Sequence, residues 1–274
     1  MRASFMAYNF FMAIFPAIIF FFTLIAYFPI HDLHEGIMQY IKHLMPADAF
    51  SAVESTLNDI LTIQHGSLLS IGFISAMLFS ANAVFNMFKA FDKYDNSPGH
   101  RSVLRRLLLS LAMTLIFSVL LILSVVLITF GQIAIDWMES KHWLNDNITY
   151  YSLIVLQWVV TLSIFYLVIS FSYYFGSSLK PKFKLITPGA TLATIVSIIA
   201  TVGFAFYVNN FGSYNRLYGS IGTLLIVLIL IYTNCLIILY GYELNASIDK
   251  ARKHHLKPAE MTAANLEQSV EKSV

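Results

Sequence analysis

The chain has 274 residues, of which 58% are hydrophobic and 12% are charged, and its formal net charge is +2. About one-quarter of the residues of a soluble globular domain are charged, so this composition excludes an ordinary soluble protein. Nucleic-acid-binding domains concentrate basic residues on one face, and a net charge this small gives no reason to expect a nucleic-acid partner.

Six mostly apolar runs are each long enough to cross a bilayer as a helix, which takes about 20 residues. They lie at about 5–28, 68–88, 107–131, 150–175, 188–208 and 220–242. The runs are continuously apolar rather than alternating, which argues against a β-barrel. The first run is longer than the apolar core of a signal peptide, so we interpret it as a retained membrane helix. The sequence therefore predicts an all-α, multi-pass integral membrane bundle of six transmembrane helices within residues 1–248.

The first span carries Asn9 and, near its middle, Pro16. Proline removes a hydrogen bond from the helix backbone and usually kinks the helix. Membrane helices tolerate proline where neighbouring groups satisfy the freed carbonyl. We therefore expect a helix kink at Pro16.

Residues 31–63 are not apolar enough to span a membrane. Apolar residues repeat with helical periodicity on both sides of Met45-Pro46, from Leu33 to Leu44 and from Phe50 to Leu61. This region has five acidic residues against the single base Lys42, so we do not expect it to bind anionic headgroups electrostatically. The sequence predicts a small extracytoplasmic pair of amphipathic helices that caps the bundle.

The second span ends in polar residues at helical spacing, which place Asn82, Asn86, Lys89 and Lys93 on one face. The fifth span begins at Thr187-Pro188, where threonine can cap the helix and proline suits its first turn. Small residues then recur at every fourth position of that span, and such a surface allows a second helix to approach closely. They are Gly189, Ala193, Ser197, Thr201 and Ala205.

A segment rich in glycine, tyrosine and asparagine, residues 209–222, leads into the sixth span. Its glycines permit tight backbone geometry, and its tyrosines suit a membrane interface. We interpret it as a rigid hairpin corner, and a substrate gate is the alternative. The residues that carry this interpretation are Gly212, Tyr214, Asn215, Tyr218, Gly219 and Gly222.

Basic residues are distributed unevenly between the connections. Thirteen of the seventeen lie before the first span, in 89–106, in 176–187 and early in the tail, whereas the other side has Lys42, Lys141 and Arg216. Because short cytoplasmic connections are enriched in Lys and Arg, we expect both termini to be cytoplasmic. Residues 249–274 are then a polar cytoplasmic tail, which lacks apolar periodicity from about Lys257 and is expected to be loosely ordered.

Polar side chains inside membrane spans are costly and mark candidate sites. The candidates are Asn9, Asn82, Asn86, Asn234 and, at the inner boundary, Glu243. Two interpretations stay open. The asparagines join helices by hydrogen bonds in a dry bundle while Glu243 is a boundary carboxylate, or all of them line a substrate-binding cavity that opens to the cytoplasm.

The sequence contains none of the common hydrolase or nucleotide-binding motifs. A metal-dependent nuclease needs grouped carboxylates or histidines, and the acids expected on the cytoplasmic side, such as Asp92 and Glu243, stand apart in the sequence. The single cysteine, Cys235, excludes a disulfide framework and a thiolate metal cluster within one chain. We therefore expect no catalytic site, no metal site and no cofactor.

Several stretches identify a likeness to a known family. They are Ala3-Ser4-Phe5-Met6-Ala7-Tyr8 through Phe15-Pro16, Pro188-Gly189-Ala190, the run from Tyr207 to Asn215, Tyr218-Gly219-Ser220-Ile221-Gly222, and Glu243-Leu244-Asn245-Ala246. On these residues, and over nearly its whole length, the chain resembles the YihY/BrkB-like family of bacterial inner-membrane proteins, once labelled ribonuclease BN. The run from Tyr207 to Ala246 is the most specific part of the likeness.

The resemblance implies a six-span protein of the bacterial inner membrane without an agreed biochemical activity. Some members are linked to envelope or virulence phenotypes, and movement of lipid or lipid-linked precursors has been suggested. The ribonuclease label is regarded as a misassignment, which agrees with the lack of nuclease residues here. Family members usually carry a cytoplasmic segment before the first span, so we expect this chain to be shortened or its start to be misplaced.

The first functional hypothesis is a transporter or a protein that handles lipids or envelope precursors, with a polar intramembrane cavity. Its partners would be membrane lipids and lipid-linked envelope precursors. The alternative is a structural scaffold of envelope assembly, and a membrane-associated ribonuclease is a remote and disfavoured third hypothesis. The first hypothesis predicts that Asn9, Asn82, Asn86 and Glu243 converge on one cleft, and the second predicts that they pair off singly.

Overall fold

The structure is a computed structural model that describes residues 1–27, 38, 47–95, 102–140, 147–177, 186–210 and 213–271. In parts of the helices, including 208–210, 213–221 and 253–271, only the course of the backbone is described. The described residues form seven helices and no strand: α1 (Arg2–Ile25), α3 (Ala47–Thr62), α4 (Gly66–Asp95), α5 (Val103–Ser140), α6 (Asn147–Gly176), α7 (Pro188–Asn210) and α8 (Ser213–Glu271). The predicted all-α fold is therefore confirmed.

Six of these helices are long and apolar enough to cross a membrane, as predicted. The candidate spans are Arg2–Ile25, Gly66–Asp92, Val103–Thr129, Tyr151–Gly176, Pro188–Tyr207 and Leu224–Arg252. Eleven of the twelve limits lie within four residues of the predicted ones, and the sixth span continues to Arg252 rather than 242, because its helix runs on through the polar residues at the membrane boundary. The helix α1 is continuous through Pro16, and the kink expected there stays a prediction.

The helices α1 and α4 form an antiparallel pair along their whole length. In the N-terminal half of α1, Asn9 meets Asn82 and Asn86 of α4. Further along, the rings of Phe20 and Phe73 lie 5.5 Å apart. This packing is close because a side chain at Gly72 would lie 3.3 Å from the backbone of Phe20.

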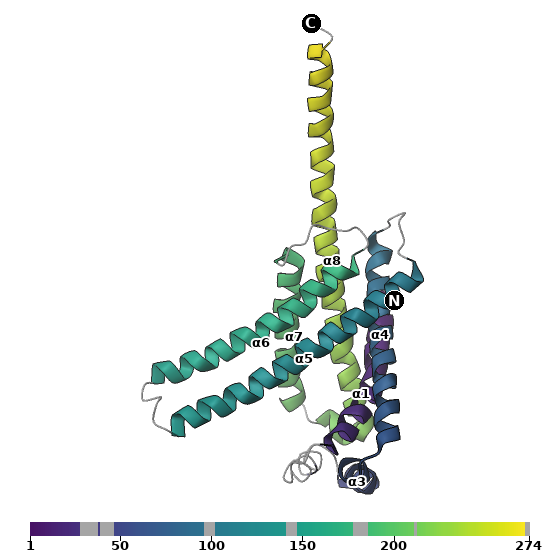
Figure 1. The fold of residues 1–274 in the computed structure, drawn as a ribbon, viewed down its shortest axis with the longest axis vertical. Coiled ribbons are helices and arrows are strands. Elements are labelled where there is room, and N and C mark those ends of the chain that lie inside the picture. The colour runs from purple at the N-terminus through teal and green to yellow at the C-terminus, as the bar shows by residue number, and fades with distance from the viewer. Residues whose placement is uncertain are drawn as a thin grey trace.

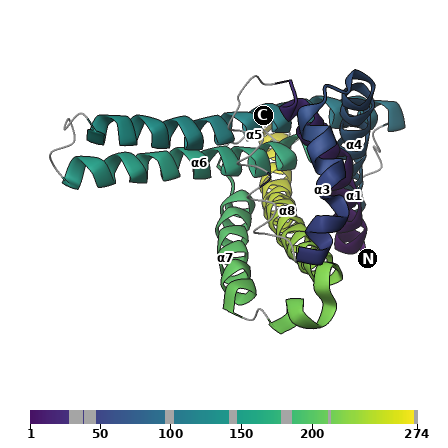
Figure 2. The same cartoon turned by 90° about the horizontal axis from the view of Figure 1, so that it is seen from below.

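The helix α3 lies across one end of the α1–α4 pair. Figure 1 shows α3 end-on beneath these helices, and Figure 2 shows that it crosses them. Leu61 of α3 is fully buried, and Gln64 just after α3 donates a 3.3 Å hydrogen bond to the carbonyl of Ala26. The second of the two predicted amphipathic helices is thus present, whereas the first, in 31–44, lies outside the described residues.

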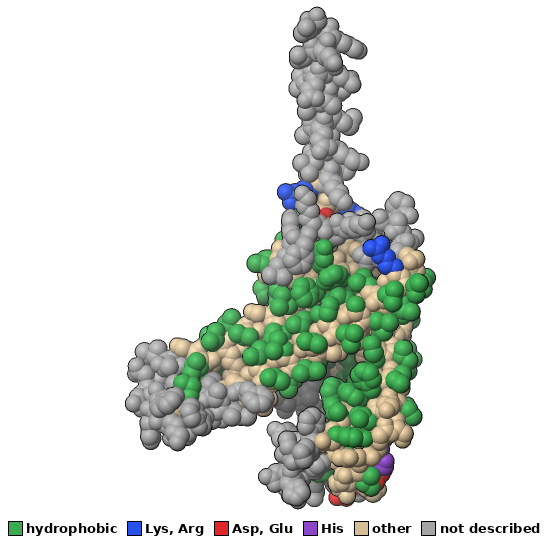
Figure 3. All heavy atoms as spheres, in the orientation of Figure 1, with side chains coloured by type: hydrophobic (Ala, Val, Ile, Leu, Met, Phe, Trp, Pro, Cys, Tyr) green, Lys and Arg blue, Asp and Glu red, His purple; other side chains and the backbone are tan. Residues whose placement is uncertain are grey.

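The opposite end of the bundle carries the described basic side chains that flank the spans, and we call it the basic end. They are Arg2, Lys89, Arg105, Arg106, Lys250 and Arg252. In Figure 3 the visible Lys and Arg side chains lie above a broad belt of hydrophobic side chains. This separation of charge from apolar surface is typical of a protein that crosses a membrane.

The helices α5 and α6 form an arm that extends sideways from the other spans (Figures 1 and 2). Gln157 of α6 ties the two helices together, since its amide nitrogen donates a 2.7 Å hydrogen bond to the carbonyl of Ile128. In each of these two spans only 11% of the most apolar window is buried, less than in the other four. Most of the arm therefore presents apolar side chains to its surroundings.

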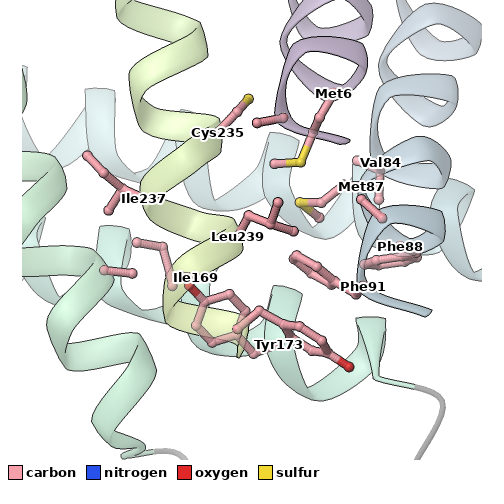
Figure 4. Close-up of a cluster of buried hydrophobic side chains, with 14 of the residues drawn as sticks. Met6, Val84, Met87, Phe88, Phe91, Ile169, Tyr173, Cys235, Ile237 and Leu239 are labelled. Carbon is pink, nitrogen blue, oxygen red and sulfur yellow. The ribbon is translucent and has the colours of Figure 1, made fainter. Parts of the chain in front are cut away.

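A dense core joins α1, α4, α5, α6, α7 and α8 near the basic end, and Figure 4 shows part of it. The rings of Phe91 and Tyr242 stack with their centroids 4.1 Å apart, and Tyr173 packs edge-on against both. Tyr173 also donates a 2.7 Å hydrogen bond to the carbonyl of Ile238. A side chain at Gly176 would lie 2.6 Å from the ring of Phe91, so only glycine fits there without a shift.

The helices α7 and α8 approach closely through small residues. A side-chain carbon built on Gly189 would collide with the carbonyl oxygen of Gly241, and one built on Gly241 would lie 2.6 Å from the carbonyl oxygen of Gly189. Gly189, Ala193 and Ser197 are buried, which confirms the first half of the predicted small-residue surface. Thr201 and Ala205 are exposed, so the second half is not a contact, because α7 and its neighbours diverge away from the basic end.

The hairpin corner expected at 209–222 stays largely untested. Gly212 lies outside the described residues, and the side chains of Tyr214, Asn215 and Tyr218, with the surroundings of Gly219, are likewise not described. The backbone from Ser213 onward is the first part of α8, and Gly222 is buried.

The tail differs from its prediction as a loosely ordered segment. The helix α8 has 59 residues and continues from the last span to Glu271, and Figure 1 shows that it projects from the bundle. The reason is intrinsic helix propensity, since Ala, Glu, Lys and Leu make up half of the residues after 250 and favour a helix even without an apolar stripe.

Candidate intramembrane binding site

Three of the five predicted site residues meet between α1 and α4. The Nδ2 groups of Asn82 and Asn86 both donate hydrogen bonds to Oδ1 of Asn9, at 2.8 Å and 3.0 Å. Asn86 also donates to the backbone carbonyl and to Oδ1 of Asn82, at 2.9 Å and 3.2 Å. The Nδ2 group of Asn9 donates to the carbonyl of Phe5 at 2.7 Å. We call Asn9, Asn82 and Asn86 the asparagine cluster.

The asparagine cluster lies well inside the apolar part of the bundle. Asn9 is seven residues from Arg2, which corresponds to about 10 Å of helix rise. Asn82 is ten residues from Asp92, about 15 Å, and so lies near the middle of the span Gly66–Asp92. At this depth water is scarce, so amides gain most by bonding to one another or to a ligand.

The members of the cluster differ in their exposure. Asn9 and Asn86 are buried, each with 7% of its surface exposed, whereas Asn82 is exposed. An asparagine amide has two N–H donors and a carbonyl acceptor. Among the described residues, one N–H of Asn82 and the Oδ1 of Asn86 have no hydrogen-bond partner. The cluster therefore holds α1 and α4 together and keeps an unused donor and an unused acceptor.

The other two predicted site residues do not join this cluster. Asn234 donates to the carbonyl of Leu230, one turn earlier in α8, at 3.1 Å. Glu243 accepts a 2.7 Å hydrogen bond from Nη2 of Arg2, and this ion pair joins α8 to α1 at the basic end. The three residues of the asparagine cluster thus meet, joined by hydrogen bonds between helices as the dry-bundle interpretation also expects, and Glu243 does not converge with them. A cleft at these residues stays a prediction.

A second ion pair lies at the basic end and was missed in the sequence, where Asp92 seemed to stand apart. Nη2 of Arg106 donates a 2.6 Å hydrogen bond to Oδ2 of Asp92, and only 10% and 5% of the two side chains are exposed. The guanidinium of Arg106 also lies 5.5 Å from the ring centroid of Phe85. The sequence did contain a signal for this pair. Asp92 and Arg106 have opposite charges and lie on either side of the short connection between α4 and α5, and a short connection keeps the ends of its two helices close together.

The beginning of α7 is held by Asn245 of α8, whose role the sequence did not indicate. Oδ1 of Asn245 accepts a 2.7 Å hydrogen bond from the backbone N–H of Gly189, and its Nδ2 donates to Oγ1 of Thr187 at 3.0 Å. Thr187 caps the helix as predicted, since its Oγ1 accepts a 3.3 Å bond from the N–H of Ala190. These contacts satisfy N–H groups that could otherwise bind an anion, so we assign this region a structural role.

An open groove of about 680 Å³ lies along α7, away from the asparagine cluster. It is lined by Ile186, Thr187, Pro188, Thr191, Leu192, Ile195 and Val196, so its surface is mainly apolar. At the start of α7 beside this groove, the backbone N–H groups of Gly189 and Ala190 are already bonded to Asn245 and Thr187. The groove therefore offers shape and apolar contact, and the asparagine cluster offers the unused hydrogen-bonding groups.

Comparisons with known proteins agree with this architecture. The sequence matches the family model described as "Virulence factor BrkB" over residues 1–266. A protein of Bacillus subtilis named "Putative ribonuclease-like protein YfkH" is 30% identical over 256 residues, which cover 92% of this chain and 90% of that protein. No solved structure gives a significant match.

Other relatives are named only as membrane proteins. A "UPF0761 membrane protein" of Aliivibrio salmonicida is 26% identical over 258 residues, which cover 91% of this chain and 78% of the relative. A "UPF0761 membrane protein" of Vibrio campbellii is 24% identical over 273 residues, which cover 97% of this chain and 82% of the relative. The family match over residues 1–266 includes the spans that contain the asparagine cluster.

Proposed function

The chain belongs to the family described as Virulence factor BrkB, and from this premise we propose that it binds and handles a membrane lipid or a lipid-linked envelope precursor. The proposed binding site is the asparagine cluster of Asn9, Asn82 and Asn86. The observation that carries the proposal is the unused N–H of Asn82, an exposed amide near the middle of a membrane span.

A purely structural amide in this position would be expected to point inward. Polar side chains in membrane spans usually face the bundle interior, where neighbouring helices satisfy them. Asn9 and Asn86 follow this rule, since both are buried. Asn82 follows it only in part, because it is exposed and one of its two N–H groups has no partner among the described residues. A ligand that arrives from the bilayer could accept that hydrogen bond without any rearrangement of α1 and α4.

The chemistry of the cluster limits what can bind at this depth. Its side chains are three neutral amides, and the ion pairs of Arg2 with Glu243 and of Asp92 with Arg106 lie at the basic end. The exposed Lys89 lies about two helical turns from Asn82, at the boundary of the span. An unpaired ionic group is costly in an apolar environment. The part of the ligand that reaches Asn82 is therefore neutral, such as a hydroxyl, an ester or an amide.

The same proposal includes location and orientation. We place the chain in the bacterial inner membrane, with the basic end and both termini in the cytoplasm, because Lys and Arg concentrate on cytoplasmic connections. In this orientation the asparagine cluster lies between the cytoplasmic boundary and the bilayer centre. The role proposed is binding and movement of the ligand without covalent chemistry.

Native mass spectrometry tests the proposal on the protein extracted gently from its own membrane. We expect a chemically defined lipid or glycolipid to stay bound, and Asn86→Leu to remove it. Asn234→Leu is the matched control, since Asn234 bonds only within its own helix. Val84→Ala controls for looser packing, because it removes buried volume from α4 and keeps every amide.

Two results would contradict the proposal. One is a bare protein mass, or only bulk phospholipid that exchanges freely, in the unaltered protein; this would favour the scaffold hypothesis. The other is equal loss of the ligand in Val84→Ala and Asn86→Leu, which would mean that helix packing rather than amide chemistry retains it.

A further inference from the structure

One face of α4 combines apolar, amide and basic side chains on the surface of the bundle. Ile71, Ile74 and Leu78 are 63%, 57% and 59% exposed, and Asn82 and Lys89 are exposed as well. At 3.6 residues per turn these five positions fall within about 80° of the helix circumference. We call them the α4 stripe. It runs from the apolar half of the span through one amide to a positive charge at the basic end.

The basic end of the α4 stripe continues onto α5. Phe85 lies between Asn82 and Lys89 along the helix, and the guanidinium of Arg106 lies over its ring. The neighbouring residue, Arg105, is exposed. Among the described residues neither Lys89 nor Arg105 has an acidic partner, whereas Arg106 is neutralised by Asp92. Lys89 on this face and Arg105 in the first turn of α5 are therefore two uncompensated positive charges at the basic end.

We propose that the α4 stripe binds an anionic lipid directly from the bilayer. The phosphate lies at Lys89 and Arg105, a neutral oxygen below the phosphate accepts the free N–H of Asn82, and an acyl chain covers Leu78, Ile74 and Ile71. This inference rests on the proposed function and adds the charge class of the ligand and its lateral route of entry.

The order of groups along the stripe matches the order of groups in such a lipid. Lys89 lies about 10 Å of helix rise from Asn82, toward the basic end. Helical side chains lean toward the helix N-terminus, so Lys89 leans along the stripe toward Asn82. The anionic group, the neutral polar linkage and the hydrocarbon of the lipid thus meet a cation, an amide and aliphatic side chains in the same sequence.

A second copy of the chain suits this face less well. Two copies in one membrane share their orientation, so a two-fold contact along α4 would set Lys89 against Lys89 at the same depth. Like charges at close range repel, and no described acid on the stripe offsets them. The uncompensated charge therefore favours an anionic ligand.

The test uses the full chain in detergent, titrated with phosphatidylglycerol or with zwitterionic phosphatidylcholine, and counts bound lipids by native mass spectrometry. Wild type is expected to bind phosphatidylglycerol in preference. Lys89→Gln should weaken phosphatidylglycerol binding about five-fold and leave phosphatidylcholine unchanged. Asn82→Leu should weaken binding of both lipids about three-fold, because both carry ester oxygens.

Two matched controls should behave as wild type. Arg252→Gln removes an exposed base from the basic end without touching α4, and Ser163→Ala removes an exposed hydroxyl from α6. Equal affinity of wild type for the two lipids, or equal effects of Lys89→Gln and Arg252→Gln, would overturn the inference. A wild-type dimer that is lost in Asn82→Leu would also overturn it, since the stripe would then be a contact between copies.

The inference and the proposed function can fail separately. If native lipid is lost in Asn86→Leu while Lys89→Gln has no effect, the proposed function stands and the α4 stripe is not its entry site. If phosphatidylglycerol binding depends on Lys89 while no native lipid depends on Asn86, the stripe binds lipid from the surrounding bilayer and the proposed function fails.

Discussion

Arg106 reaches back from α5 to Asp92 near the end of α4, and the two side chains form a buried ion pair with a 2.6 Å hydrogen bond. The pair joins the end of α4 to the beginning of α5, the first helix of the arm that Figure 1 shows. Its neighbour Arg105 is exposed. Adjacent arginines thus have opposite surroundings, which makes them a matched pair for experiment.

Arg106→Gln should destabilise the protein much more than Arg105→Gln. Removing one partner of a buried ion pair leaves an uncompensated charge and costs about 3 kcal/mol or more. Removal of an exposed charge changes the free energy of unfolding by less than about 0.5 kcal/mol. Equilibrium unfolding in mixed micelles measures both. Equal stabilities of the two variants would show that the Asp92–Arg106 pair is not buried in the membrane-embedded protein.

Gly189→Ala should disrupt the contact of α7 with α8. The new methyl group would collide with the carbonyl oxygen of Gly241 and with the side chain of Asn245, and overpacking of this kind costs about 3 kcal/mol. Gly203→Ala is the matched control in the same helix, since a side-chain carbon there would meet nothing within 4 Å. Thermal unfolding of both variants checks the prediction, and a Gly189→Ala protein as stable as Gly203→Ala would contradict the close approach.

Asn86→Leu should weaken the α1–α4 pair, and Asn234→Leu should not. Asn86 bonds to Asn9 across the helix interface, and interhelical bonds of this type contribute about 0.6 to 1.7 kcal/mol in membranes. Asn234 bonds only to Leu230 of its own helix, so no contact between helices is lost. The comparison is made by unfolding in mixed micelles. A stability loss confined to Asn234→Leu would mean that the asparagine cluster does not form.

Chemical labelling tests the orientation. In a Cys235→Ala background, which removes the single cysteine, Arg252→Cys and Glu54→Cys each introduce one exposed thiol. A membrane-impermeant maleimide added to spheroplasts should label Glu54→Cys and reach Arg252→Cys only after the membrane is opened. The reverse pattern would invert the topology, and with it the assignment of the basic end to the cytoplasm.

The sequence by itself determined the membrane class, the six spans and the uneven distribution of basic residues. These properties depend on local composition, because an apolar run of about 20 residues has few alternatives to a membrane helix. The amphipathic pattern from Phe50 to Leu61 likewise predicted α3, since a polar face and an apolar face mark a helix at a boundary. The family likeness also follows from the sequence alone, most specifically from the run Tyr207 to Ala246.

Only the tertiary structure decided which polar groups meet. A span that is apolar around its whole circumference gives no signal about which face touches a neighbour. The sequence therefore left open whether Asn9 meets Asn82 and Asn86, and it did not pair Gly189 with Gly241. The same limit made Glu243 seem part of one cleft and Asp92 seem isolated. Helix rotation and partner choice are set by close packing and by hydrogen bonds between segments far apart in the chain, and local composition does not encode them.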